Sequence, residues 1–389
     1  MNTGRTVFSQ LMDFLPPHEF HKCVDRYHGN YRARQLSCRD QFLCLMFAQL
    51  TGRESLRDVV VCLRAMGHRL YHAGFRGRIS RSTLADANET RDWRIYADFA
   101  MTLIQRARTL YRDEPLPEGI DQSVYAFDST TIDLCLKLFP WAKFRRHKSA
   151  VKIHTLIELR GSIPCFLHIT GGKVGDVVVL DQLPIEAGAF YVMDRGYIDF
   201  ARLYRITQKR AFFVTRAKSA MAYKRRSYRA VDKTTGLRSD TTIRLSGPLS
   251  SRLYPEGIRR IAYYDDELDK RFVFLTNNFA LPALVIAELY RRRWSVELFF
   301  KWIKQNLRIK AFYGYSINAV KTQIWISMCV YLLVTILRKE LGIERSMADL
   351  LQILSLTLFE KDAVSRNFFV ENPKRQQDEI SNQLSLFEL

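Results

Sequence analysis

The spacing of hydrophobic residues changes near residue 112. Before that point apolar residues recur at steps of three and four, as in CRDQFLCLMFAQL at 38–50 and SLRDVVVCLRAM at 55–66, which is typical of helices with one buried face. After it come short apolar runs, several of which end in glycine, as hairpin strands often do. The runs predict strands at 123–130, 150–161, 163–172, 189–197 and 212–218, with helices at 177–188 and 199–211.

Breaks in this pattern divide the chain into parts. Two prolines and a glycine in DEPLPEGID, at 113–121, mark the end of the helical part. From residue 217 a basic, tyrosine-rich segment interrupts the strand–helix order, and strand character returns in KRFVFLTNNF at 270–279. We expect a helical region at 1–112, an α/β core at 113–216 and 281–345, a β-rich insertion at 217–280, and a C-terminal helical region with a mobile tail at 346–389.

The longest apolar run, IWISMCVYLLVTIL at 324–337, lies inside a helix expected from about residue 318 to 340. It is shorter than the roughly 20 apolar residues that span a bilayer. We therefore predict a buried core helix and no membrane contact. No secretory signal is visible at the N-terminus, because charged residues and a Pro16–Pro17 pair interrupt it.

The charge indicates a polyanionic partner. The formal net charge is +20 and the pI is about 9.7, and nucleic acid is the usual partner of so basic a chain, although ribosomal and membrane-surface proteins are basic too. Residues 137–152 hold six Lys or Arg and no acid, and residues 217–260 hold 11 Lys or Arg against 3 Asp or Glu. The candidate DNA contacts in these segments are Arg145, Arg146, Lys148, Lys224, Arg225 and Arg226. The alternative is charge that only keeps loops soluble.

A second basic feature precedes a short helix at about residues 81–90. Arg76, Arg78 and Arg81 surround its start, and Ser80 or Ser82 is the candidate N-cap. The arrangement suits a helix-turn-helix that contacts DNA, and it also suits an ordinary solvated helix end.

The seven cysteines are an odd number without a CxxC pair. This argues against a disulfide framework and favours a reducing cytoplasm. A group of His and Cys residues near the N-terminus is a weak zinc candidate, because its spacing matches no standard site. Its members are His18, His21, Cys23 and His28.

The segment YRRRWSVELFFKWIKQ, at 290–305, predicts one helix with a charged stripe. At about 100° per residue, five side chains fall within a sector of about 80°, beside an apolar stripe that would pack on the core. The five are Tyr290, Arg293, Glu297, Lys301 and Lys304. Ordinary i,i+4 ion pairs would explain such a stripe as well.

Two aspartates supply further carboxylates. Asp128 lies inside the run YAFDST, and Asp194 follows the apolar run of VMDRGY. An unpaired charge after an apolar run is unfavourable, so a functional reason is expected, although Asp194 is also placed to cap a turn. Because Mg²⁺ prefers oxygen ligands, several carboxylates brought together are what a metal-dependent phosphoryl-transfer site requires.

The residues Tyr290, Arg293, Glu297 and Lys304 match Y-x2-R-x3-E-x6-K. This pattern resembles the YREK signature of the IS-four family of bacterial insertion-sequence transposases, and Asp128 and Asp194 resemble the two catalytic aspartates of that family. DRGY at 194–197 and FYGYSINAVKTQIW at 312–325 add to the resemblance, which spans about residues 115–340. Residues 1–112 resemble, more weakly, the accessory DNA-binding region of such proteins.

The resemblance implies a fold and a mechanism. The α/β part would be an RNase H-like catalytic domain whose mixed sheet gathers Asp128, Asp194 and Glu297 around two Mg²⁺ ions, with Mn²⁺ as a substitute. Such a DDE transposase nicks the ends of its element, forms hairpins and joins the 3′-hydroxyls to target DNA. Tyr290, Arg293 and Lys304 would hold phosphates, and Lys301 shares their face. A nuclease without strand transfer and a decayed DNA-binding copy are the alternatives.

The resemblance also implies an assembly, its DNA sites and a base-stacking residue. The synaptic complex would contain a homodimer on double-stranded DNA, at the terminal inverted repeats and the target, in the cytoplasm near the nucleoid. Hairpin-forming relatives stack a flipped base on a tryptophan of the insertion, but none occurs between Trp141 and Trp294 here, which leaves the stacking residue in doubt. The candidate replacements are Tyr263, Tyr264, Phe272 and Phe274.

The C-terminal string QLSLF resembles the peptide with which bacterial proteins bind the replication sliding clamp. Its candidate contacts are Gln383, Leu384, Leu386 and Phe387. An apolar tail that packs on its own domain is the alternative.

Overall fold

Helices build the N-terminal part of the protein, which a computed structural model describes at residues 4–67, 69–116, 119–309, 311–364 and 368. They are α1 (Val7–Leu11), η1 (Met12–Phe14), α2 (Pro17–Arg26), α3 (Cys38–Leu50), α4 (Leu56–Ala65), α5 (Arg69–His72), α6 (Arg81–Thr90) and α7 (Arg94–Leu110). Ser37 and Asp40 form a capping box at the start of α3. Ser80 caps α6, because its hydroxyl accepts a hydrogen bond from the Thr83 amide. The helices predicted at 38–50 and 55–66 are confirmed.

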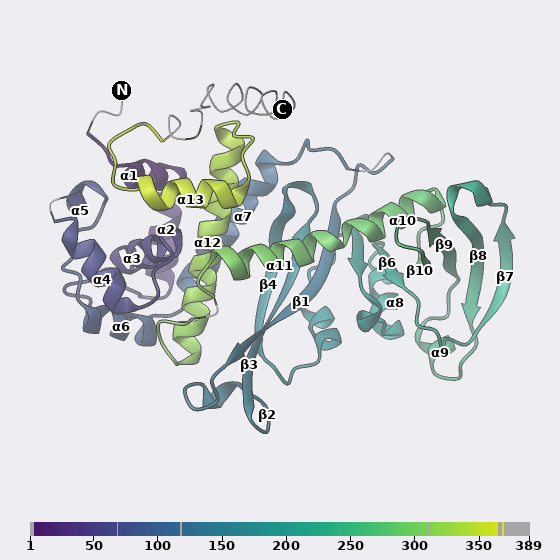
Figure 1. Ribbon diagram of the computed structural model, residues 1–389. Coiled ribbons are helices and arrows are strands. Elements are labelled where there is room, and N and C mark those ends of the chain that lie inside the picture. The colour runs from purple at the N-terminus through teal and green to yellow at the C-terminus, as the bar shows by residue number, and fades with distance from the viewer. Residues whose placement is uncertain (1–3, 68, 117–118, 310, 365–367, 369–389) are drawn as a thin grey trace, which may run out of the picture.

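Helix α12 (Ile317–Glu340) passes between the N-terminal helices and the sheet (Figure 1). It is long and apolar enough to cross a membrane, but 94% of its most apolar window is buried inside the protein. It shares one hydrophobic core with α3, α7 and the neighbouring face of the sheet. The prediction of a buried core helix is confirmed.

After the N-terminal helices, the described residues form one ten-stranded sheet with its covering helices. Its strands are β1 (Val124–Leu134), β2 (Lys143–Arg145), β3 (Lys148–Glu158), β4 (Ile163–Gly171), β5 (Phe190–Met193), β6 (Phe212–Arg216), β7 (Tyr223–Arg229), β8 (Leu237–Leu245), β9 (Ile258–Asp265) and β10 (Lys270–Thr276). β3 runs antiparallel to β1 and β4, whereas β1, β5 and β6 are parallel neighbours. The order β4-β3-β1-β5-β6 is the RNase H-like arrangement, so the expected mixed α/β fold is confirmed.

The basic segment after β6 continues this sheet. β7, β8 and β9 form an antiparallel meander, β9 pairs with β10, and β10 pairs with β6. β7 is the outer edge, at the right of Figure 1, and all seven of its residues are exposed. The insertion is therefore rich in strands, but its strands extend the main sheet.

Two predicted helices differ in detail from the structure. The helix expected at 177–188 is the 3₁₀ helix η4 (Asp176–Gln182), which ends before an extended Leu183. Pro184 follows, and a proline disfavours helical geometry in the residue before it. The helix expected at 290–305 is divided into α10 (Ala283–Arg292) and α11 (Trp294–Asn306). At Arg293 the chain tightens to i,i+3 hydrogen bonds, from Arg293 to Tyr290 and from Val296 to Arg293.

Helices cover both faces of the sheet. On one face, α11 and α12 pack on residues such as Ala126 of β1. On the other face, η4 and α8 (Phe200–Gln208) pack on Tyr125 and Phe127. Short helix α9 (Ser250–Leu253) lies beside α8, and α13 (Met347–Thr357) lies against α11 and α12.

Candidate active site

Asp128 and Asp194 lie at corresponding places on two neighbouring parallel strands. The register of β1 and β5 pairs Phe127 with Met193, so the next residue of each strand path is an aspartate. Side chains alternate between the faces of a strand. Phe127 and Met193 share one core, and the two aspartates therefore lie on the opposite face, toward α10 and α11.

Glu297 comes to the same place from α11. This helix buries Val296 and Ile303 in the core that it shares with α12 and β1. Asp128, Asp194 and Glu297 together line one pocket of about 650 Å³. Three acids from three separate elements, up to 169 residues apart in sequence, thus meet at one cavity.

Arg293 forms ion pairs with two of these acids. Its Nη2 lies 2.6 Å from Oε1 of Glu297, and its Nη1 lies 3.4 Å from Oδ2 of Asp128. The arginine side chain is only 12% exposed. A guanidinium between two carboxylates relieves their mutual repulsion, and charge-assisted hydrogen bonds are stronger than neutral ones.

Asp194 has partners of its own. The Tyr290 hydroxyl donates to Asp194 Oδ1 over 3.1 Å, and Arg216 Nη2 lies 3.7 Å from the same oxygen. Burial raises the pKa of Tyr290 to about 12, and the Asp194 carboxylate acts in the same direction. Tyr290 is therefore a protonated donor at neutral pH. Arg216 is the last residue of β6, and the sequence analysis missed it because its approach to Asp194 depends on the pairing of β5 with β6.

Asp128 is the most confined of the three acids. Burial raises the pKa of its carboxyl, and the nearby Glu297 charge adds to this, while the Ser129 amide and Arg293 oppose it. Asp128 Oδ1 accepts hydrogen bonds from the Ser129 amide at 2.8 Å and from the Tyr197 hydroxyl at 3.3 Å. The charged form is therefore held by specific donors against the cost of burial.

The chemistry of the donor set fits a hard divalent cation. Carboxylate oxygens are the preferred ligands of such ions, and a buried acid with a raised pKa gains from added positive charge. In the part of the chain that the structure describes, no three His, Cys, Asp or Glu side chains are close enough to hold one ion as they stand. Cation binding by Asp128 and Glu297 would therefore replace the ion pairs of Arg293.

The zinc candidate near the N-terminus can be checked in the same way. His18, His21, Cys23 and His28 all lie in described segments, and they form no such group. Cys23 is buried in the core of the helical region instead. The structure therefore does not gather these four residues into a zinc site.

The other predicted DNA contacts lie elsewhere. Among the described residues, the lining of the pocket includes neither Lys301, which is exposed, nor Lys304, which is half-buried. Exposed basic side chains stand on the β2–β3 hairpin, which projects at the bottom of Figure 1, and on edge strand β7. On the hairpin they are Arg145, Arg146 and Lys148, and on β7 they are Lys224, Arg225 and Arg226.

Three of the aromatic candidates reach the acids. Tyr263, Phe272 and Phe274 line the pocket, and the rings of Phe272 and Phe274 are stacked with centroids 6.0 Å apart. Tyr264 is instead covered by Arg238, whose guanidinium carbon lies 5.2 Å from the ring centre. Trp294 also lines the pocket and is 55% exposed.

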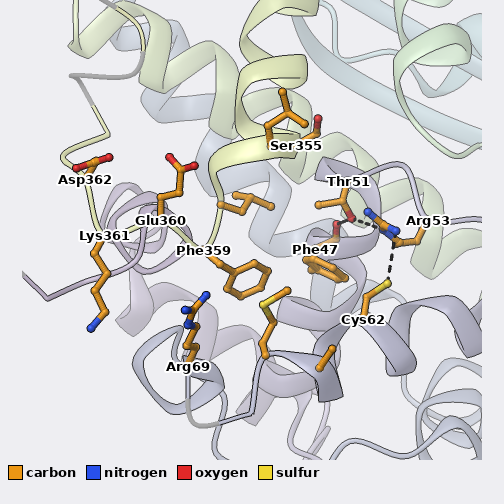
Figure 2. A pocket seen from close by; sticks show the side chains of 14 residues that line it. Phe47, Thr51, Arg53, Cys62, Arg69, Ser355, Phe359, Glu360, Lys361 and Asp362 are labelled. Atoms are coloured by element: carbon orange, nitrogen blue, oxygen red, sulfur yellow. Dashed lines mark hydrogen bonds between the residues drawn. The ribbon is translucent and has the colours of Figure 1, made fainter.

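A second pocket, of about 680 Å³, lies between α3, α4 and the segment that follows α13 (Figure 2). Its wall is largely apolar, with Phe47, Met66 and Phe359 among its residues. None of the predicted catalytic or DNA-binding residues lines it. This pocket lies between residues 47–69 and 355–362 and shares no lining residue with the site of the three acids.

Comparison with known proteins places the site in a family. A family model described as "Transposase DDE domain" matches residues 119–333, more than half of the chain, and a domain of unknown function (DUF4372) matches residues 3–76. The protein belongs to the DDE transposases. A putative transposase, y4zB, of Sinorhizobium fredii is 34% identical over 72% of this chain and 77% of its own length.

Two further relatives of this transposase carry the names of insertion sequences. A probable transposase for element IS5377 of Geobacillus stearothermophilus is 29% identical over 53% of this chain and 54% of its own length. A putative transposase for element IS4SA of Synechocystis is 26% identical over 77% of this chain and 83% of its own length. The resemblance to insertion-sequence transposases is confirmed. As a DDE transposase the protein acts on DNA and uses divalent metal ions.

Proposed function

We propose that this transposase cuts and joins DNA with Asp128, Asp194 and Glu297 as its metal ligands. The observation that carries the proposal is the meeting of these three acids, from β1, from the end of β5 and from α11, at one pocket. The ions would be two Mg²⁺, with Mn²⁺ as a substitute, because all three ligands are hard oxygen donors. When bound, such ions polarise the scissile phosphate and activate a water or a 3′-hydroxyl.

The chain's own residues then position the DNA. Arg293 would exchange its carboxylate partners for a phosphate, since a guanidinium recognises both groups through paired N–H donors. Tyr290 would donate its hydroxyl to a phosphate oxygen near Asp194, where its raised pKa keeps the proton in place. Lys304, and Lys301 on the exposed side of α11, would contact the backbone beyond the pocket.

The reaction would follow the order of related transposases. The ends of the element, at its terminal inverted repeats, are nicked by hydrolysis. The released 3′-hydroxyl attacks the opposite strand to form a hairpin, and the opened ends are joined to target DNA. The aromatic wall made by Tyr263, Phe272 and Phe274 supplies a surface on which an unstacked base would rest, since base–aromatic stacking is favourable for any base.

DNA outside the pocket would lie on the basic surfaces. The β2–β3 hairpin and edge strand β7 present Arg145, Arg146, Lys148, Lys224, Arg225 and Arg226 to solvent. The helical region, with Arg76, Arg78 and Arg81 at the start of α6, would add a further contact. We also propose the division into a DNA-binding region at 1–112, a catalytic domain at 113–216 and 281–345, an insertion at 217–280 and a C-terminal region at 346–389.

Larger assemblies belong to the same proposal. Two copies would hold two element ends in the synaptic complex, and the protein would work in the cytoplasm at the nucleoid. The tail residues Gln383, Leu384, Leu386 and Phe387 lie outside the described residues, and we propose from their sequence that they bind the sliding clamp. A clamp pull-down with Leu386→Ala plus Phe387→Ala tests this, and undiminished retention of the double variant contradicts it.

A cleavage and strand-transfer assay tests the central proposal. The substrate is duplex DNA with the gene's own flanks, and the wild type is compared with Glu297→Gln under Mg²⁺. We expect that only the wild type nicks the ends and joins them to a target plasmid. Cleavage without joining would identify a nuclease. DNA binding without cleavage by either protein, under any divalent metal, would indicate a DNA-binding copy without catalysis.

A further inference from the structure

Two further carboxylates, Asp176 and Asp265, line the pocket of the three acids, and Asp265 pairs with Arg291. Asp176 contacts the strand that carries Asp128. It is the first residue of η4, and its side chain is 40% exposed. Oδ1 of Asp176 accepts hydrogen bonds from the Ser129 hydroxyl at 2.9 Å and from Lys152 Nζ at 3.1 Å. The family signature contains none of these three residues, so their arrangement is a feature of this fold.

Ser129 connects Asp176 to Asp128. Its side chain donates to Asp176, while its backbone amide donates to Asp128 Oδ1 over 2.8 Å. One residue therefore holds both acids, the first with its hydroxyl and the second with its N–H. Anchoring of the Ser129 side chain on Asp176 restrains the backbone of Ser129, whose amide donates to the Asp128 carboxylate.

Strand β3 contributes two further side chains, Lys152 and His154, to this arrangement. Lys152 Nζ also donates to the Val174 carbonyl over 2.9 Å, which ties the chain before η4 to the sheet. His154 is fully buried, with Nε2 at 2.9 Å from the Thr170 hydroxyl and Nδ1 at 3.7 Å from Asp176 Oδ1. Burial lowers the pKa of His154 to about 4, so its ring is neutral near pH 7. Lys152 is then the cation that balances Asp176.

We propose that Asp176 is a positioning residue of the catalytic site, which acts through Ser129 to fix the Asp128 carboxylate in the direction of the pocket. The inference rests on the proposed role of Asp128 as a metal ligand. Partners that orient a ligating group without touching the ion typically change metal affinity or activity by about 10–100-fold when they are removed. An effect of that size is expected here.

Mn²⁺ affinity, measured by isothermal titration calorimetry on the full chain, gives a readout that is independent of turnover. Asp176→Ala and Ser129→Ala should each weaken Mn²⁺ binding by about 10–100-fold. In cleavage assays both should lower kcat by a similar factor and leave the KM for DNA within about twofold. Asp176→Asn keeps an acceptor oxygen for Ser129, and Ser129→Thr keeps the hydroxyl, so each should recover part of the loss.

Asp181→Asn is the matched control. Asp181 lies on the same 3₁₀ helix but pairs with Arg202 and Arg205, away from the pocket lining. It should bind Mn²⁺ as the wild type does. Thermal melting of every variant checks that the fold is kept, and the partly exposed Asp176 tolerates replacement better than a buried acid would.

A double-mutant cycle tests whether Asp176 affects Mn²⁺ binding through Ser129. If Asp176 acts through Ser129, the double variant Asp176→Ala plus Ser129→Ala loses no more Mn²⁺ affinity than the weaker-binding single variant. Additive losses would show that Asp176 acts independently, and folded single variants with wild-type affinity and kcat would show that it has no role; either result overturns the inference. A wild type that neither binds Mn²⁺ nor cuts DNA refutes the proposed function itself, and the inference falls with it.

Discussion

Arg293 Nη2 lies 2.6 Å from Glu297 Oε1, and the same guanidinium reaches Asp128 Oδ2 at 3.4 Å. The contact with Asp128 joins the start of α11 to the middle of β1, across 165 residues of sequence. The arginine of the signature thus serves as the counter-ion of the signature acid Glu297 and of Asp128. In the proposed function, Arg293 would leave these carboxylates when a cation binds them and would then contact a phosphate.

Removal of Arg293 should destabilise the protein most when no divalent cation is present. In Arg293→Ala the carboxylates of Asp128 and Glu297 face each other without their shared cation. Loss of one partner of a largely buried ion pair is expected to lower the free energy of unfolding by about 3 kcal/mol. Urea unfolding with and without millimolar Mg²⁺ measures this, and Mg²⁺ should restore much of the loss.

The neighbouring Arg292→Ala is the control for that measurement. Arg292 is more exposed and pairs with Glu288 along α10. Its removal should change the free energy of unfolding by about 0.5 kcal/mol or less, with or without Mg²⁺. Equal effects of the two substitutions would contradict a special role of Arg293.

Asp128→Asn should raise the thermal stability at pH 7 while it abolishes cleavage. Because burial raises the pKa of Asp128 above its ordinary value of 3.8, the folded state binds this proton more tightly than the unfolded state. The free energy of unfolding therefore falls as the pH rises from the unfolded-state pKa of Asp128 past its higher folded-state pKa, because the buried carboxyl ionises. The difference in Tm between the variant and the wild type should shrink as the pH is lowered toward 4. A lower Tm of the variant at pH 7, without divalent cations, would contradict this.

Tyr290→Phe should lower the cleavage rate without a change in the shape of the pH–rate profile between pH 6 and about 10. The substitution removes the donor to Asp194 but keeps the ring, which packs with its centroid 4.9 Å from that of Phe274. Because the pKa of Tyr290 is raised to about 12, its hydroxyl stays protonated through this range. If one limb of the wild-type pH–rate profile disappears in the variant, Tyr290 is the titrating group, and this prediction is contradicted.

Replacement of Lys224, Arg225 and Arg226 by alanine should weaken binding to DNA of any sequence and flatten its salt dependence. All three side chains are exposed on edge strand β7, so the fold should be kept. Loss of three phosphate contacts would reduce the slope of log K against log salt by up to about 2.7. Fluorescence anisotropy across a salt series measures the slope. Lys22→Ala, which removes an exposed lysine paired with Glu19, should leave the slope unchanged.

The sequence by itself determined the elements and the family. The hydrophobic period distinguished the helices of the N-terminal part from the strands of the sheet, and the apolar run at 324–337 marked α12 as a core helix. Asp128 and Asp194 could be selected because a charge that follows an apolar strand stands out locally. The YREK spacing could be read from one segment, since residues three and four apart share a helix face.

The tertiary structure alone decided which side chains meet. Pairing of β10 with β6 made the insertion part of the main sheet, and the start of η4 brought Asp176 to the pocket. Arg216 and Asp176 join the site, and Arg293 pairs with Asp128, through contacts between elements far apart in the chain, whereas the pairing of Arg293 with Glu297 is a local i,i+4 contact. The local sequence cannot specify such partners, because they depend on strand order, register and burial, which arise only when the whole sheet and its covering helices pack together.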